Sequence, residues 1–230
     1  MSFSSEWETA YRNGTNNSIW PWTELISRFY RYFPAKKTYY NEVNVLELGC
    51  GAGANIPFFE SLGVNYYAIE GSAYEVSRLQ ERFDGNKRIN ILEGDFTKGI
   101  PYEKNFHLIF DRAAITHNST EDIKKTVGYV YQHLEDDGYF IGINWFASKE
   151  PDYCNRENVE EIIDDRTYKF SSGIYGGLGN SHFTDEEELR FLLSDFDIKE
   201  MYLNIEQYVY PNNRGRFQWS FVAKKGNRNG

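Results

Sequence analysis

The sequence predicts an α/β protein with a doubly wound, mainly parallel sheet that ends in an antiparallel hairpin. Short apolar runs alternate with segments of helical period through most of the chain, and two long strand-like runs, 196–210 and 216–225, follow one another near its end. Strands that alternate with helices form parallel sheets, whereas consecutive strands joined by a short turn form a hairpin. A chain of 230 residues is long enough for one such domain and short for two.

Each element follows from a local pattern. Strand character is expected in seven segments: 43–48, 65–70, 89–95, 106–111, 138–146, 196–210 and 216–225. Helical spacing of apolar residues is expected in five: 21–33, 55–62, 73–83, 119–134 and 184–193. Helices are expected between most of the first six strands, though not between 89–95 and 106–111, and none is expected between the last two. We therefore predict a seven-stranded sheet in a single domain, residues 1–230.

Composition narrows the classes of partner. The net charge of −9 is opposite to the basic footprint of proteins that bind a nucleic-acid backbone, so no nucleic-acid partner is expected and a small or neutral substrate is favoured. No apolar run approaches the roughly 20 residues of a membrane span, and the first residues lack the pattern of an export signal. With only two cysteines, Cys50 and Cys154, the expected location is the reducing cytoplasm.

The stretch "NVLELGCGAGAN", residues 44–55, is the strongest local signal. An apolar strand runs into glycines at alternate positions, Gly49, Gly51 and Gly53, before the next helix. Glycines at such a turn let a ligand approach the backbone and the helix N-terminus. A nicotinamide dinucleotide and S-adenosylmethionine both use such a turn, and Ala54 can complete the dinucleotide pattern. The glycines alone leave both ligands open.

Acidic residues at the ends of the strands separate the two ligands. Glu47 lies two residues before the first glycine, where a pyrophosphate would repel it and a positively charged ligand would stabilise it. Glu70 ends the second strand and can accept hydrogen bonds from ribose hydroxyls of either ligand. Asp95 and Phe96 follow the third strand, where a carboxylate can accept from an adenine amino group and a ring can pack on its face. The dinucleotide pattern does not require this last pair.

In this order, "VLELGCGAG", Glu70, "GDF" and "FHLIFD" resemble the class I S-adenosylmethionine-dependent methyltransferases over about residues 43–145. The resemblance implies a Rossmann-like fold, S-adenosylmethionine as cofactor, and methyl transfer to a hydroxyl or amine of a small molecule, such as a sugar or another metabolite. It also implies which residues hold the cofactor: Glu47, Gly49, Gly51 and Gly53 around the methionine part, Glu70 at the ribose, Asp95 and Phe96 at the adenine, and Asp111 where the methionine and acceptor side begins.

The segment "DRAAITHNST" after the fourth strand holds the candidate catalytic residue. His117 lies six residues beyond Asp111, at the edge of the sheet where ligands of such folds bind. A histidine is suited to take a proton from the acceptor or to orient it. The alternative is a histidine that packs against, or caps, the helix that begins near Ser119. Arg112 is expected to serve as an ion-pair or capping partner.

Two further segments are expected to cover the site. Residues 1–40 are interpreted as a helical lid, with Tyr11, Trp20 and Trp22 as rings near the sulfonium and Trp20 as a cofactor contact. The long connection 146–183 is interpreted as an insertion over the acceptor site, in which Tyr175 and His182 bind substrate and His182 is the second candidate for the base. The alternatives are rings that only bury the helix, and a flexible loop without substrate contact.

Other chemistries are less well supported by the sequence. Asp111 and Asn144 end neighbouring strands and could be two ligands of a divalent cation, but no third ligand is evident, so no metal is expected. An NAD(P)-dependent oxidoreductase would leave Glu47 and "GDF" without a role, and no Tyr-x-x-x-Lys pattern is found. A cofactor-binding subunit without activity remains open. The acceptor and the oligomeric state are not predicted.

Overall fold

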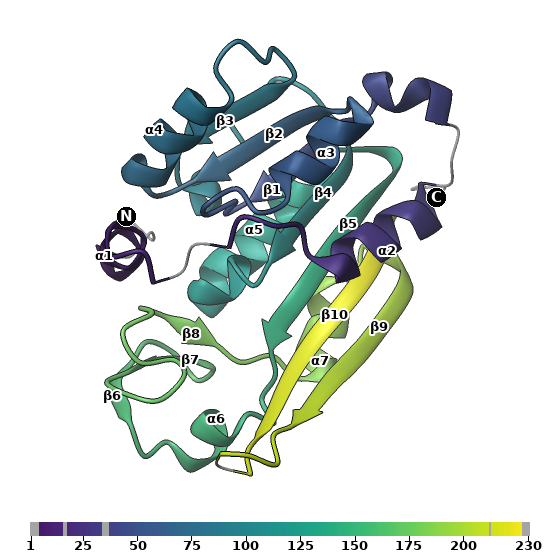
Figure 1. Cartoon of the computed structure of the whole chain (residues 1–230). Coiled ribbons are helices and arrows are strands. Elements are labelled where there is room, and N and C mark those ends of the chain that lie inside the picture. Colours follow the sequence, from purple (N-terminus) through teal and green to yellow (C-terminus); the bar gives the residue numbers. More distant parts are fainter. Residues whose placement is uncertain (1–4, 16–17, 34–36, 212, 227–230) are drawn as a thin grey trace.

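The computed structural model describes residues 5–15, 18–33, 37–211 and 213–226, and it contains the predicted seven-stranded sheet (Figure 1). The strands are β1 (Asn44–Leu48), β2 (Asn65–Glu70), β3 (Ile89–Glu93), β4 (Phe106–Arg112), β5 (Leu134–Phe146), β9 (Phe196–Gln207) and β10 (Gly215–Lys225). Their order is β3-β2-β1-β4-β5-β10-β9. Strands β1 to β5 pair in parallel, whereas β10 is antiparallel to both β5 and β9. The predicted fold class is confirmed.

Helices cover both faces of the sheet. They are α1 (Ser5–Arg12), α2 (Thr23–Tyr32), α3 (Ile56–Leu62), α4 (Ala73–Arg82), α5 (Thr120–His133), α6 (Pro151–Asn155) and α7 (Glu186–Leu192), with 3-10 turns η1 (Lys37–Glu42), η2 (Phe96–Lys98) and η3 (Ile115–His117). Apolar side chains of α2, α3 and α4 pack on one face, and those of α5 and α7 pack on the other. No helix of the described part of the chain combines the length and apolarity that crossing a bilayer requires.

Strand β1 shows how the sequence builds these two layers. Successive side chains of a strand point to opposite faces of its sheet. Val45 accordingly packs in the layer of α2, α3 and α4, and Leu46 and Leu48 pack in the layer of α5 and α7. Glu47 points to the first layer and is the buried acid among these apolar positions. Both faces of the sheet are therefore covered, and the carboxyl ends of the parallel strands are the part that the two helix layers leave uncovered.

The connection 146–183 differs from the long loop expected from the sequence. It contains α6 and a second sheet of three strands: β6 (Val159–Ile162), β7 (Thr167–Phe170) and β8 (Ser181–His182). These strands are four residues or fewer, too short for a periodic pattern to reveal. Packed rings stabilise the unit, with Phe146, Tyr168, Phe170, Tyr175 and Phe183 in one buried cluster.

Helix α1 lies beside α4, on the side of the sheet where β2 ends (Figure 1). Its Glu8 side chain accepts a hydrogen bond, 2.5 Å long, from the hydroxyl of Ser72, which caps α4. This helix was not predicted as a separate element within the expected lid. Residues 1–4, 16–17 and 34–36 of that segment lie outside the described residues.

The same substitution at two glycines should have opposite effects on stability. A Cβ at Gly142 of β5 would lie 2.3 Å from the Phe221 ring and 3.0 Å from the Trp145 indole nitrogen, whereas a Cβ at Gly128 of α5 meets nothing within 4 Å. Gly142→Ala should lower the free energy of unfolding by about 1–3 kcal/mol through overpacking. Gly128→Ala should raise it by about 0.5–1 kcal/mol through helix propensity. Urea unfolding of both variants tests this, and equal effects would contradict it.

Candidate functional site

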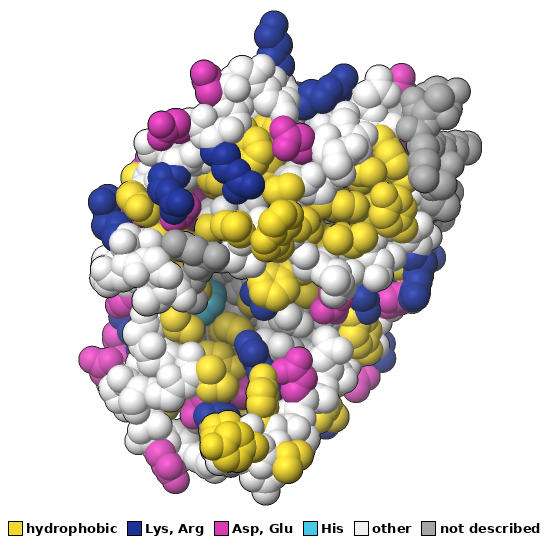
Figure 2. All heavy atoms as spheres, viewed as in Figure 1, with side chains coloured by type: hydrophobic (Ala, Val, Ile, Leu, Met, Phe, Trp, Pro, Cys, Tyr) yellow, Lys and Arg dark blue, Asp and Glu magenta, His cyan; other side chains and the backbone are white. Residues whose placement is uncertain are grey.

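A cavity of about 530 Å³ opens at the carboxyl ends of the parallel strands. In Figure 2 it is the hollow in the middle of the visible face, with a histidine inside and Lys or Arg side chains at its wall. Its lining comes from the turns after β1, β2, β3 and β4, from β5 and β10, from α1, and from the segment between β7 and β8. Residues far apart in the sequence thus converge at one edge of the sheet, where ligands of such sheets bind.

The glycine turn brings bare backbone to this cavity. Gly49 and Gly51 line it, and both have positive φ, +71° and +52°. A Cβ at Gly49 would lie 2.4 Å from the Cβ of Ala114, and one at Gly51 would lie 2.7 Å from the hydroxyl of Tyr11. Gly53 does not line the cavity, although it was predicted with the other two. It packs on Leu79 of α4, so its role here is in joining the turn to the helix layer.

Glu47 lies at the bottom of the cavity and is 2% exposed. Its carboxylate accepts hydrogen bonds from the Asn55 side chain at 2.8 Å and from the Tyr66 hydroxyl. Burial raises the pKa of Glu47 to about 8, although these two bonds oppose the shift. A positively charged ligand beside it would favour the ionised form, so the position suits a cation and disfavours a phosphate.

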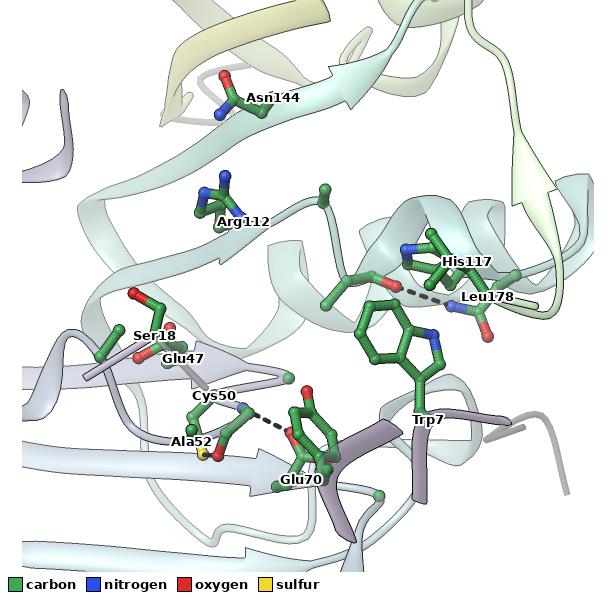
Figure 3. Close-up of a pocket in the computed structure, with 18 of the residues that line it drawn as sticks. Trp7, Ser18, Glu47, Cys50, Ala52, Glu70, Arg112, His117, Asn144 and Leu178 are labelled. Atoms are coloured by element: carbon green, nitrogen blue, oxygen red, sulfur yellow. Dashed lines mark hydrogen bonds between the residues drawn. The ribbon is translucent and has the colours of Figure 1, made fainter. Parts of the chain in front are cut away.

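Glu70 connects the turns after β1 and β2. Its carboxylate accepts from the backbone N–H of Gly51 at 2.7 Å and from that of Ser72 at 2.9 Å (Figure 3). Burial raises the pKa of Glu70, and the backbone donors lower it. A carboxylate has lone pairs beyond those two bonds. Glu70 lines the cavity and can therefore also accept from ligand hydroxyls.

Asp95 and Phe96 line the next part of the wall. Asp95 caps η2, where it accepts from the Thr97 N–H at 3.0 Å and from the Thr97 hydroxyl at 2.6 Å. The Phe96 ring lies 3.8 Å from the position a Cβ would take on Gly49. The ring and the glycine turn thus form neighbouring walls of the same cavity.

Asp111 lies outside the cavity lining, contrary to its predicted place on the methionine and acceptor side. It is fully buried, and it accepts from the Ile115 N–H at 3.0 Å and from the Trp145 indole at 2.8 Å. Burial raises the pKa of Asp111 to about 7. Its contacts tie the end of β4 to η3 and β5. The following residues, Arg112 and Ala113, line the cavity instead.

His117 lies in the cavity wall at the end of η3 (Figure 3). Its Nδ1–H donates to the backbone carbonyl of Asn180 at 2.8 Å. This bond requires the proton on Nδ1 and leaves a lone pair on Nε2. Burial lowers the pKa of His117 to about 4, so the ring is neutral near pH 7. Ser119, not His117, caps α5 by accepting from the Asp122 N–H.

Rings of the N-terminal segment cover the cavity, though not all those predicted. Tyr11 and Trp22 line it, whereas Trp20 is 73% exposed and does not. Trp22 begins α2 and faces inward, which leaves Trp20, two residues earlier, on the solvent side. Trp7 was missed: its ring packs edge-on against His117 at 4.9 Å between centroids. The i, i+4 spacing of Trp7 and Tyr11 on α1 was the sequence signal for an aromatic face.

The segment between β7 and β8 contributes Ile174, Tyr175 and Leu178 to the cavity. Of the two residues predicted to bind substrate, Tyr175 and His182, only Tyr175 is among the residues that line the cavity. His182 does not line the cavity and is fully buried. It contacts the Thr167 hydroxyl at 2.9 Å and a Glu188 carboxylate oxygen at 3.2 Å. These contacts join the small sheet to α7, so the position of His182 does not support a role as base.

A wall rich in hydrogen-bond donors completes the cavity, and the sequence did not reveal it as a group. It consists of Arg112, Asn144, Arg216 and Gln218, from β4, β5 and β10. Arg112 was expected to form an ion pair or a cap; its guanidinium instead stacks over the Trp22 ring, 3.5 Å from the centroid. Within the residues that the structure describes, no group of three or more His, Cys, Asp or Glu side chains could hold a metal ion.

Comparisons with known proteins agree with this geometry. The family model described as "Methyltransferase domain" matches residues 45–138. A phosphoethanolamine N-methyltransferase of Plasmodium falciparum (isolate 3D7) is 29% identical over 126 residues, which are 54% of this chain and 46% of that protein. The match therefore spans less than half of the relative's length.

Solved structures share the fold at low sequence identity. A 1,6-didemethyltoxoflavin-N1-methyltransferase of Burkholderia thailandensis, with 1,6-didemethyltoxoflavin and S-adenosylhomocysteine bound, has a TM-score of 0.62 at 16% identity, with 96% of this chain and 86% of that chain covered. The N-methyltransferase NodS of Bradyrhizobium japonicum WM9, in complex with S-adenosylhomocysteine, has a TM-score of 0.61 at 14% identity, with 96% and 99% covered.

The protonation of Glu47 predicts a change in the pH dependence of stability. The pKa of Glu47 is about 8 in the folded chain, whereas its ordinary value is 4.5. Between these two pH values the folded chain holds a proton that the unfolded chain releases, so rising pH favours unfolding. In wild type, the free energy of unfolding should therefore fall between pH 5 and pH 8. Glu47→Gln should make this fall smaller by on the order of a few kcal/mol. Urea unfolding at both pH values measures this. Exposed Glu93→Gln is the control, and parallel pH curves for wild type and Glu47→Gln would contradict the prediction.

Proposed function

We propose that this chain is a class I S-adenosylmethionine-dependent methyltransferase that transfers a methyl group to a nitrogen or oxygen of a small-molecule acceptor; the methyltransferase-domain match over residues 45–138 and the methyltransferase relatives support this. The observation that carries this proposal is the shared cavity. Two carboxylates and the glycine turn lie on one side of it, and a neutral histidine with an available Nε2 lone pair lies on another. A cofactor site and a proton acceptor are thus within one enclosed space.

The residues present fit the cofactor. Gly49 and Gly51 form a cradle that a Cβ would fill, and Glu47 is a buried acid whose pKa shift calls for a cationic neighbour. We assign Glu47, the side-chain-free backbone of Gly49 and Gly51, and Asn55 to the methionine part, Glu70 to the ribose, and Asp95 with Phe96 to the adenine. When bound, S-adenosylmethionine supplies a methyl group on a positively charged sulfur, ready for displacement.

The chain's own part is to align the acceptor, exclude water and take a proton. We assign the proton to Nε2 of His117, because the Asn180 carbonyl holds the other ring nitrogen protonated. Trp7 and Tyr11 of α1, with Tyr175 and Leu178 of the insertion, enclose the space from the solvent side. Residues 1–40 and 146–183 are accordingly proposed as the lid and the acceptor-binding insertion of a single domain.

The relatives support a small acceptor, since one is a phosphoethanolamine N-methyltransferase and another methylates N1 of a toxoflavin precursor. Both cysteines are free thiols, and a cytoplasmic setting is part of the proposal. The test is incubation of the full chain with S-adenosylmethionine and a panel of amines, amino acids, sugars and phosphoethanolamine, with detection of S-adenosylhomocysteine and of the methylated product. Cofactor binding without turnover across broad panels would favour a non-catalytic cofactor-binding subunit.

Removal of the Glu70 carboxylate should weaken cofactor binding. Glu70→Ala is expected to reduce the affinity for S-adenosylhomocysteine by about 1–3 kcal/mol, since charge-assisted hydrogen bonds to the ribose are lost. Calorimetric titration measures it. Glu93→Ala is the matched control, because Glu93 ends the neighbouring strand β3, pairs in register with Glu70 and is exposed. Unchanged affinity in Glu70→Ala would remove Glu70 from the site.

Removal of the His117 imidazole should slow turnover without loss of the cofactor. His117→Ala is expected to reduce kcat about 10²-fold or more if Nε2 takes the proton. The measurement is the steady-state rate with an acceptor found in the panel, alongside S-adenosylhomocysteine affinity. His133→Gln is the control, since His133 bonds only the Tyr129 carbonyl of its own helix among the described residues. Full activity of His117→Ala would leave His117 a packing residue.

A further inference from the structure

Two arginines in the cavity wall make no salt bridge within the described part of the chain. Arg112 comes from the end of β4 and Arg216 from the start of β10, and both line the cavity. Each has a buried Nε that makes no hydrogen bond. Neither guanidinium lies within salt-bridge distance of a carboxylate in the described ranges, although the charge of Glu24 acts on Arg112 and Glu150 interacts electrostatically with Arg216. Burial lowers the pKa of Arg112 to about 10; the positive charge of Arg216 adds to this shift, and the negative charge of Glu24 opposes it.

Other partly buried arginines of this chain are paired. Arg214, two residues before Arg216, forms ion pairs with Asp152 and with Glu150. Arg166 pairs with Asp185 at 2.7 Å and with Glu188 at 3.4 Å. A buried charge without a partner is costly, and two adjacent like charges are more so. Among the described residues, Arg112 and Arg216, which line the cavity, thus lack the direct carboxylate contacts that Arg214 and Arg166 make.

Neutral donors lie beside the two arginines. Asn144 neighbours Arg112 across β4 and β5, and its side chain also lines the cavity (Figure 3). Its backbone has φ +58°, a conformation that non-glycine residues rarely adopt and that clusters at functional sites. This strained residue lies opposite the irregularity of β10 between Trp219 and Phe221. Gln218 of β10 donates to the Asn144 carbonyl at 3.4 Å and completes the wall.

The cavity is therefore divided by charge. Acids gather at the ends of β1, β2 and β3, in Glu47, Glu70 and Asp95, where a cationic cofactor is proposed. Guanidinium groups gather at β4 and β10. The Trp22 ring covers one face of the Arg112 guanidinium, whose buried Nε has no hydrogen-bond partner within the described residues. Planar guanidinium edges match carboxylate and phosphate oxygens.

We propose that the methyl acceptor carries an anionic oxygen group, a carboxylate or a phosphate monoester, which pairs with Arg112 and Arg216 and accepts further hydrogen bonds from Asn144 and Gln218. The inference rests on the proposed function and names its substrate class. It also refines the small or neutral acceptor expected from the overall charge: the acceptor is small, and one end of it is negative. The opposing assignment is that these arginines hold the carboxylate of the cofactor itself.

The test is a thermal-unfolding titration of the full chain saturated with S-adenosylhomocysteine. Sodium phosphate or sodium acetate replaces sodium chloride at constant ionic strength, and S-adenosylhomocysteine affinity is measured separately by calorimetry. In wild type, one of the two anions should raise the unfolding midpoint with saturation, and the anion that does so identifies phosphate or carboxylate as the group. Arg112→Gln and Arg216→Gln should raise the half-saturating concentration about tenfold or more, with S-adenosylhomocysteine affinity kept within about threefold.

Arg190→Gln is the control, because Arg190 pairs with Glu186 on the exposed face of α7 and should respond as wild type does. If a glutamine variant does not fold, Arg216→Lys replaces it, since lysine keeps the charge and loses the two-pronged contact. An anion response that is absent or equal in all variants overturns the inference. A tenfold loss of S-adenosylhomocysteine affinity in the arginine variants also overturns it, in favour of the cofactor carboxylate. Failure of wild type to bind S-adenosylhomocysteine at all would instead overturn the proposed function.

Discussion

Three carboxylates at or near the ends of strands are buried, and their need for hydrogen-bond donors is the constraint on which the site depends. Glu47, Glu70 and Asp111 are each nearly or fully buried, and each must find donors within the protein. Each acid finds at least one donor in a neighbouring turn: the Asn55 side chain before α3 for Glu47, the amides of Gly51 and Ser72 for Glu70, and the amide of Ile115 in η3 for Asp111. Side chains of neighbouring strands, Tyr66 of β2 and Trp145 of β5, donate to Glu47 and Asp111 as well. Each acid therefore links one strand to the loop that lines the cavity, and the loops acquire fixed positions.

The same constraint explains why α1 packs closely on the glycine turn. Because Glu70 holds the Gly51 amide, the glycine turn presents its bare backbone outward, and Tyr11 of α1 occupies the space a side chain would fill. The hydrogen bond from Ser72 to Glu8 places α1 over the adjoining turn. Trp7 then lies against His117 and limits the access of water to the imidazole. The hydrogen bond between Glu70 and the Gly51 amide thus affects the surroundings of His117, the proposed proton acceptor.

Sequence reasoning reached the parts of the site that follow parallel strands, because the ends of such strands share one edge wherever they fall in the chain. Glu47, Glu70, Asp95 and His117 are of this kind. It did not reach Arg216, whose place depends on the antiparallel register of β10 and on an irregularity in that strand. Strands of two to four residues, as in the insertion, carry too little periodicity to be predicted. His182 was misplaced for the same reason, since the small sheet turns it toward α7.

The pKa shifts and the arginine wall are parts of one electrostatic arrangement. With pKa values of about 8 and about 7, Glu47 and Asp111 hold protons for much of the time at neutral pH while no cation lies beside them. They then offer little negative charge to offset the guanidinium groups of Arg112 and Arg216. A cationic ligand would lower the pKa of Glu47 and make its side of the cavity negative, which increases the separation of charge across the cavity. An anionic acceptor would be attracted electrostatically toward a cationic methyl donor along the same axis of the cavity, where charges are weakly screened.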